Sequence, residues 1–212
     1  MGQSIEAGKQ AAGESRDSRG GTAERMDALM AALVAALFTQ ASDRTPWTAA
    51  LLGDRYASKA AVIAATALAI ALGNAIGVVG GVIVAPMLSP NARDLLLAFA
   101  LLSAGASGCW PLKPPKLRDW RLGAFSSSLV AVGMLGFGDR TQFITAALAA
   151  RSTTPALAAV GATIGAMVVL VPAILLGTRG LRKIPTTALR IAASVALLIS
   201  GAVQGLGALR LI

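Results

Sequence analysis

The sequence predicts an all-α membrane protein with six transmembrane helices, arranged as two inverted three-helix repeats. Three observations lead to this prediction: an apolar composition, long apolar stretches separated by short polar ones, and an internal repeat. Hydrophobic residues make up 55% of the 212 residues and charged residues only 14%, whereas soluble domains carry roughly 25% charged residues. A span needs about 20 residues, so the apolar stretches leave room for about six. Their continuous hydrophobicity disfavours a β-barrel.

Charge and cysteine usage exclude several classes of protein. The net charge is +9, but the basic residues lie singly or in short groups between apolar segments, which favours juxtamembrane anchoring over nucleic-acid binding. One cysteine, Cys109, and no histidine leave no disulfide framework and no Cys/His metal site. An enzyme has no support, because no catalytic constellation is available outside the motif described below. We expect no resident cofactor.

The chain divides into four parts. Residues 1–25 form a polar segment that we expect to be a disordered tail, with a regulatory or targeting segment as the alternative. Residues 26–109 hold the first three-helix repeat and residues 122–212 the second. Between them, residues 110–121 form a basic, proline-rich connector with tryptophans at its flanks, which is typical of a membrane interface.

Three apolar runs are predicted as spans in the first repeat, at about 26–42, 60–84 and 94–108. The first run is short and leads to an Asp-Arg-Thr motif followed by Pro46. Because proline disfavours helix at the preceding residue, we expect the helix to break there. In the second run, Gly73, Gly77 and Gly81 recur at every fourth position, which predicts close helix packing. Asn74 beside them either hydrogen-bonds across helices or faces a cavity.

The second repeat has predicted spans at about 122–138, 155–177 and 187–207, with a kink expected at Pro172. A shift of 96 positions superposes the two halves. It places Arg55 on Arg151, and it places Asp43-Arg44-Thr45 on Asp139-Arg140-Thr141. Since each half has an odd number of spans, the halves are inverted relative to each other. Transporters of this architecture bind their substrate near the midplane between the repeats.

Basic residues also predict an orientation. Eleven of the 19 Lys and Arg residues follow the first, third and fifth spans. The positive-inside rule therefore places the central connector in the cytoplasm and both termini outside. We expect a multi-pass protein of a bacterial-type inner or plasma membrane.

The two motif copies resemble those of the GDT family of cation/proton exchangers, which export manganese or calcium. Each half of that family carries Glu-x-Gly-Asp-Lys/Arg-Thr/Ser. The second copy here runs from Gly136 through Gly138 and Asp139 to Phe143, and the first runs from Gln40 to Trp47. Both glutamate positions differ, because they hold Gln40 and Gly136. Ser42 also replaces the first-copy glycine.

Hard divalent cations prefer oxygen ligands, and the motifs supply them. Asp43 and Asp139 are the predicted metal ligands and the predicted proton carriers, because protonation and cation binding compete for a carboxylate. Two acids in place of four weaken divalent binding. The predicted neutral ligands are Thr45, Thr141, Gln40, Gln142 and Ser42, and the supporting residues are Gly138, Arg44 and Arg140.

The leading functional prediction is a secondary transporter of inorganic cations, such as Mn²⁺ or Ca²⁺, that works by proton-coupled antiport. Its expected partners are the lipid bilayer, the cation and the proton, with homo-oligomerisation left open. The alternative is a transport-inactive relative that acts as an assembly or regulatory partner in the membrane, in which the motif aspartates only form ion pairs with the motif arginines.

Overall fold

A computed structural model describes residues 26–110 and 123–209, and this part of the chain is entirely helical, without strands. Three helices are long and apolar enough to cross a membrane, and two shorter helices are also apolar. Residues 1–25, and therefore the predicted tail, lie outside the described residues, as does the connector after Trp110. The helices are the N-terminal helix Met26–Ala41, α2 Thr45–Arg55, α3 Lys59–Val84, the 3₁₀ turn η1 Ala85–Met87, α4 Pro90–Gly108, α5 Ala124–Gly136, α6 Arg140–Arg151, α7 Pro155–Leu181 and α8 Thr186–Ala208.

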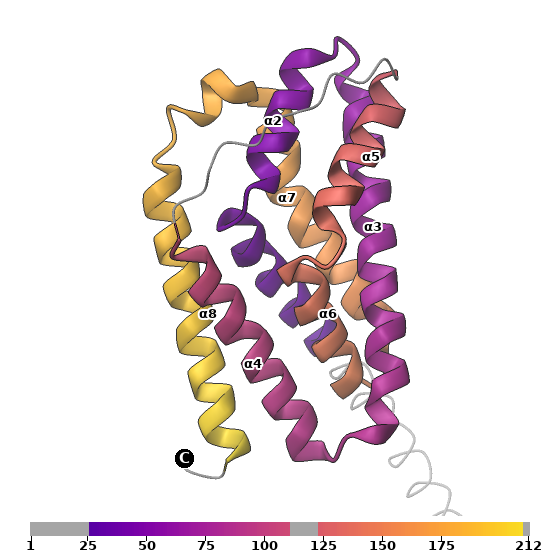
Figure 1. Cartoon of the computed structure of the whole chain (residues 1–212), viewed down its shortest axis with the longest axis vertical. Coiled ribbons are helices and arrows are strands. Elements are labelled where there is room, and N and C mark those ends of the chain that lie inside the picture. The colour runs from indigo at the N-terminus through magenta and orange to yellow at the C-terminus, as the bar shows by residue number, and fades with distance from the viewer. Residues whose placement is uncertain (1–25, 111–122, 210–212) are drawn as a thin grey trace, which may run out of the picture.

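Each motif lies at a break between two helices that follow one another. The N-terminal helix ends shortly before Asp43, and α2 begins just after it. In the second half α5 ends before Asp139, and α6 begins directly after it. Figure 1 shows the break between α5 and α6 at mid-height of the bundle. The first and fourth apolar runs are short because each is only one part of a two-part helical segment.

Local chemistry explains both breaks. In the first, Pro46 occupies the start of α2, where its missing N–H is not needed. In the second, Gly138 has a φ of 75°, a left-handed conformation that favours glycine. Asp139 then caps α6, because its carboxylate accepts the backbone N–H of Arg140 at 2.7 Å. The expected break after Asp43 is therefore present, and a glycine and a cap produce its counterpart without proline.

Helices α4 and α8 lie side by side, and their contacts are reciprocal under the 96-residue shift (Figure 1). Gly105 of α4 packs against Ser194 and Leu198 of α8. In return, Gly201 of α8 packs against Ala98 and Leu102 of α4. Every residue of the second contact lies 96 positions from its counterpart in the first. At the level of whole helices, the contact of α2 with α7 corresponds under the same shift to the contact of α6 with α3.

The glycines of α3 allow α6 to approach closely. A Cβ at Gly77 would lie 2.8 Å from the backbone oxygen of Gln142, and one at Gly81 would collide with the backbone oxygen of Ala146. At Gly80, one residue before, a Cβ would meet nothing within 4 Å. The predicted packing role of this glycine stripe is therefore confirmed by the contacts.

This difference makes a first prediction about stability. Gly81→Ala should destabilise the protein by about 1–3 kcal/mol, because overpacking forces the backbones of α3 and α6 apart. Gly80→Ala is the matched control and should be neutral or slightly stabilising, since alanine favours helix over glycine. Thermal unfolding of the purified protein in detergent measures both variants. Equal melting temperatures for the two would contradict the packing role of Gly81.

The irregular backbone of α7 lies at Gly177, where φ is 64°, and not at the proline. Pro172 sits inside the helix five residues earlier. Gly177 is required there because a Cβ would collide with the carboxylate of Asp54 at the end of α2. That carboxylate accepts the backbone N–H of Thr178 at 2.9 Å and its hydroxyl at 2.5 Å. The bond to α2 places the irregularity at the glycine, where a left-handed residue fits.

Candidate functional site

Asp43 is held by groups from both halves of the chain. Its Oδ1 pairs with Arg140 Nη2 at 2.6 Å, and the two side chains are only 14% and 18% exposed. Its Oδ2 accepts the Thr45 hydroxyl at 2.5 Å and the Thr45 backbone N–H at 3.3 Å. Both oxygens of this carboxylate therefore have partners, and one partner belongs to the other motif.

The guanidinium of Arg140 also reaches α4. Its Nη1 donates to the backbone oxygen of Ala104 at 3.3 Å and to the hydroxyl of Ser107 at 3.1 Å. Neither residue is identified by the motif pattern, because one contributes only its backbone and a single serine in an apolar span is common. These contacts fix the planar guanidinium between the first motif and α4, which suits its geometry of fixed donors.

Like Asp43, Asp139 accepts hydrogen bonds from residues of its own motif. Its Oδ1 accepts the backbone N–H of Arg140 at 2.7 Å, and its Oδ2 accepts the Thr141 hydroxyl at 3.1 Å. The oxygen of that hydroxyl in turn accepts Gln40 Nε2 from the N-terminal helix at 3.3 Å. A second bond thus joins the two motifs, from the glutamine that occupies the first glutamate position.

The carbonyl oxygen of Gln40 is the exception in this network. The side chain is buried, yet its Oε1 has no hydrogen-bond partner among the described residues. A buried polar atom without a partner is costly. Gln40 Oε1 is therefore an acceptor available to a ligand at the junction of the two motifs.

The structure joins six of the predicted residues in one network, and it places the other four elsewhere. Gln142 Oε1 accepts the backbone N–H of Gly138 at 3.0 Å, so these two residues stabilise the second break. The Ser42 hydroxyl donates to the backbone oxygen of Thr39 at 2.9 Å. Arg44 is exposed. The six joined residues are Gln40, Asp43, Thr45, Asp139, Arg140 and Thr141.

The site is not symmetric, although the motifs are. The counterpart of the Arg140–Asp43 pair would join Arg44 to Asp139, and no such pair occurs among the described residues. Ser107, which holds Arg140, corresponds under the 96-residue shift to Val203, which has no hydroxyl. Among the described residues, the hydroxyl that binds Arg140 therefore has no counterpart at the repeat-related position of α8.

Asn74 extends the polar interior one layer further. Its Nδ2 donates to the Thr163 hydroxyl of α7 at 3.1 Å, and its Oδ1 accepts the Thr145 hydroxyl of α6 at 3.4 Å. Of the two interpretations of this residue, the structure supports hydrogen bonding across helices. Thr145 also donates to the backbone oxygen of Thr141 at 2.7 Å, which connects this layer to the site.

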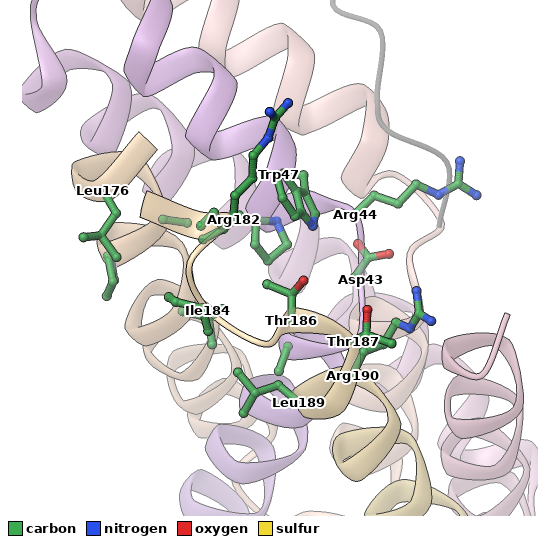
Figure 2. A pocket seen from close by; sticks show the side chains of 16 residues that line it. Asp43, Arg44, Trp47, Leu176, Arg182, Ile184, Thr186, Thr187, Leu189 and Arg190 are labelled. Atoms are coloured by element: carbon green, nitrogen blue, oxygen red, sulfur yellow. The ribbon is translucent and has the colours of Figure 1, made fainter. Parts of the chain in front are cut away.

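A cavity of about 460 Å³ adjoins Asp43 on one side. It lies between the start of α2, the second half of α7 and the start of α8 (Figure 2). Asp43 and Arg44 line it, whereas Asp139 does not. The first carboxylate is therefore next to an open space, and the second is on the side where α6 packs closely on the glycines of α3.

Chemically, the site offers two carboxylates and several neutral oxygens. Arg140 joins the two acids, because its side chain pairs with Asp43 and its backbone N–H donates to Asp139. Among the described residues, no group of three or more His, Cys, Asp or Glu side chains converges. An ion bound here would rely on two acids supplemented by hydroxyl and amide oxygens.

Apolar helices of spanning length around a buried, charged centre are typical of an integral membrane protein with a polar site between its helices. Comparison with known sequences agrees. The profile of the family described as "Divalent cation/proton antiporter GDT1" matches residues 28–115 and 124–210. The chain belongs to this family, as its motifs suggested. The two matched segments begin 96 residues apart, which is the shift that superposes the two halves.

One relative supports the same assignment. A protein of Vibrio cholerae serotype O1 (strain ATCC 39541 / Classical Ogawa 395 / O395), named "Putative manganese exporter", is 30% identical over 170 residues. The match covers 78% of this chain and 84% of that protein. No solved structure matches the chain.

Proposed function

We propose that this protein is a secondary transporter that exchanges a divalent inorganic cation of the Mn²⁺ or Ca²⁺ type for protons. The observation that carries the proposal is the bond from Arg140 of the second motif to Asp43 of the first. Two segments about 100 residues apart in sequence thus form one buried polar centre. The family assignment and the name of the Vibrio cholerae relative support a cation as the cargo.

The chemistry follows from competition for the two acids. A divalent cation that binds Asp43 must displace the Arg140 guanidinium from that carboxylate. Asp139, the hydroxyls of Thr45 and Thr141, and Gln40 Oε1 complete a set of oxygen ligands within the same network. When the cation leaves, protons neutralise the carboxylates, since charged groups inside a membrane are costly. Exchange of a cation for protons is the consequence.

For the architecture, we propose six spans in two inverted repeats, with residues 26–109 and 122–212 as the two halves. The reciprocal contacts of α4 and α8 and the repeated family match support this arrangement. If the two motif arginines are left out of the orientation count, ten basic residues remain on one side against seven on the other. The connector is then cytoplasmic, in a bacterial-type inner membrane.

The second candidate function is a transport-inactive relative that assembles with other membrane proteins. It is favoured by one specific observation, which is that the Asp43 carboxylate is already fully bonded to Arg140 and Thr45. In this case the twin motifs hold the two halves together and bind no ion.

Ion flux into proteoliposomes distinguishes the two functions. We expect the wild-type protein to move Mn²⁺ or Ca²⁺ in exchange for protons when a proton gradient is imposed. Asp139→Asn should reduce that flux at least tenfold, because a neutral amide replaces the carboxylate that binds the cation and carries the proton. Asp94→Asn is the matched control. Asp94 pairs with Arg151 at 2.7 Å, and both side chains are about one-third exposed. Its loss should leave the flux nearly unchanged.

Two results of the flux measurement would reject transport. If the wild type moves none of Mn²⁺, Ca²⁺ or Mg²⁺, or if Asp139→Asn moves them as fast as the wild type, the site does not carry cations. Purification of the wild type with a second membrane protein at fixed stoichiometry, together with no ion binding, would instead support the assembly function.

A further inference from the structure

The cavity beside Asp43 is strongly basic. Three arginines line it, namely Arg44 from the first motif, Arg182 from the end of α7 and Arg190 from α8 (Figure 2). Asp43 is the only acid among the described residues that line it, and that carboxylate is already paired with Arg140. The walls therefore carry an excess of positive charge, which is the opposite of what a cation site needs.

Among the described residues, the three arginines of the cavity form no ion pair. Arg190 Nε is buried and has no hydrogen-bond acceptor among the described residues. Arg44 and Arg182 form no ion pair within the same part of the chain. A buried donor without an acceptor is costly, so the cavity is incomplete as it stands. An anion with several oxygen atoms would supply the missing acceptors.

The start of α8 adds neutral groups of the same kind. Thr186 and Thr187 lie in its first turn and line the cavity. Residue Pro185 precedes the helix, and no side chain caps it. The first turn of a helix carries a partial positive charge and free N–H groups, which favour anions. Two hydroxyls and a helix start thus face the same space as the three arginines.

The remaining walls are apolar. Trp47 of α2, Leu176 of α7 and Leu189 of α8 are among them (Figure 2). Fixed arginine donors match the oxygens of phosphate in pairs. An apolar wall beside such donors also accommodates the hydrocarbon part of an amphipathic anion.

We propose that this cavity is a binding site for a phosphate group, supplied either by an anionic lipid headgroup or by free phosphate. Arg190 and the two threonine hydroxyls bind the phosphate oxygens, and the exposed Arg44 and Arg182 add positive charge to the cavity. The proposal does not depend on cation transport, because its ligand is an anion and Arg190, Thr186 and Thr187 belong to α8 and not to the motifs. A protein that moves no cation would still contain the site.

Thermal unfolding of the full-length protein in detergent tests the proposal with defined probes. The probes are inorganic phosphate, phosphatidylglycerol, and phosphatidylcholine as the zwitterionic lipid, each compared with sodium chloride at equal ionic strength. We expect phosphate or phosphatidylglycerol to raise the melting temperature by several degrees at saturation. A response to free phosphate identifies the ion as sufficient, and a response to phosphatidylglycerol alone identifies the lipid headgroup.

Variants locate the site. Arg190→Gln should weaken binding of the responding probe about tenfold, as expected for loss of a charged hydrogen-bond donor. Lys183→Gln is the matched control, since it removes the same charge from an exposed residue beside Arg182 that does not line the cavity. It should leave binding unchanged. If Arg190→Gln does not fold, Arg182→Gln, which alters an exposed side chain of the cavity, takes its place. The expected loss of binding is then smaller than tenfold but still larger than that of Lys183→Gln.

Two results would overturn the proposal. One is no response of the wild type to either phosphate or phosphatidylglycerol beyond the chloride control. The other is an equal loss of binding in the cavity variant and in Lys183→Gln, which would show nonspecific attraction to the basic surface. Ion flux is not part of either measurement, so failure of the phosphate site and failure of cation transport are separate outcomes.

Discussion

Arg140→Gln is expected to destabilise the protein by about 3 kcal/mol, which is the magnitude found when one partner of a buried ion pair is removed. The substitution leaves the Asp43 carboxylate buried without the positively charged guanidinium, and it removes the donors to Ala104 and Ser107 of α4. The loss should appear as a lower melting temperature of the purified protein in detergent.

A second arginine in the same chain provides the control. Arg151 pairs with Asp94 at 2.7 Å, almost the same separation, but the side chains are 33% and 35% exposed. Exposed pairs contribute only about 0.2–1 kcal/mol, so Arg151→Gln should be nearly neutral. The double variant Asp43→Asn/Arg140→Gln should recover much of the stability, because no unpaired charge is left. Equal effects of Arg140→Gln and Arg151→Gln would show that burial does not strengthen the central pair.

The repeated Asp-Arg-Thr triplet, together with the odd number of spans in each half, predicted a shared site between the two halves. Identical residues 96 positions apart imply related positions in the two halves, and Pro46 indicated the first helix break. The second break depends on Gly138 in a left-handed conformation and on the Asp139 cap. A glycine before an aspartate is compatible with many structures, so this break was not evident beforehand.

The asymmetry of the site could not be predicted from the motifs, because both copies carry the same arginine. It depends on neighbours in other helices. Ser107 offers a hydroxyl to Arg140, and its counterpart Val203 offers none. Likewise Gln40 reaches Thr141, while Gly136 at the equivalent position has no side chain to reach Thr45. Polar residues that differ between the halves decide which hydrogen bonds form. Their role depends on contacts between helices, which the motif pattern does not contain.

The irregular backbone of α7 also depends on a contact with another helix. A proline is the usual sequence signal for an irregular helix, and Pro172 was the natural candidate. The irregular residue is Gly177, because Asp54 at the end of α2 bonds to the adjacent Thr178. Asp54 and Thr178 are more than 100 positions apart in the sequence. Local sequence signals therefore do not predict their contact.

Restoring the missing acids is expected to strengthen divalent cation binding. Gln40→Glu should raise the affinity for Mn²⁺ at least tenfold, because a third carboxylate joins Asp43 and Asp139 at the centre, and hard cations prefer charged oxygen ligands. The substitution nearly preserves shape. It loses the bond donated to Thr141, and the Thr141 hydroxyl can donate to the new carboxylate only by giving up its bond to Asp139. Gln40 Oε1 has no partner among the described residues that would be lost.

Adding Gly136→Glu should raise the affinity further. A Cβ at Gly136 meets nothing within 4 Å, so a side chain enters without a clash. Gly133→Glu is the matched control, because its Cβ is equally unobstructed but lies one helical turn farther from the motif. Isothermal titration with Mn²⁺ measures all three variants.

The pH dependence of that gain separates ligation from general attraction. A new acid near Asp43 and Asp139 in an empty site binds a proton to reduce the repulsion, and that proton must leave before the cation binds. The gain of Gln40→Glu should therefore increase as pH rises and shrink as pH falls. A gain that is the same at every pH, or one that Gly133→Glu reproduces, would mean that the added charge attracts Mn²⁺ without coordinating it. A pH-dependent gain confined to the motif positions would place the cation between the two halves, at the centre that Arg140 occupies when the site is empty.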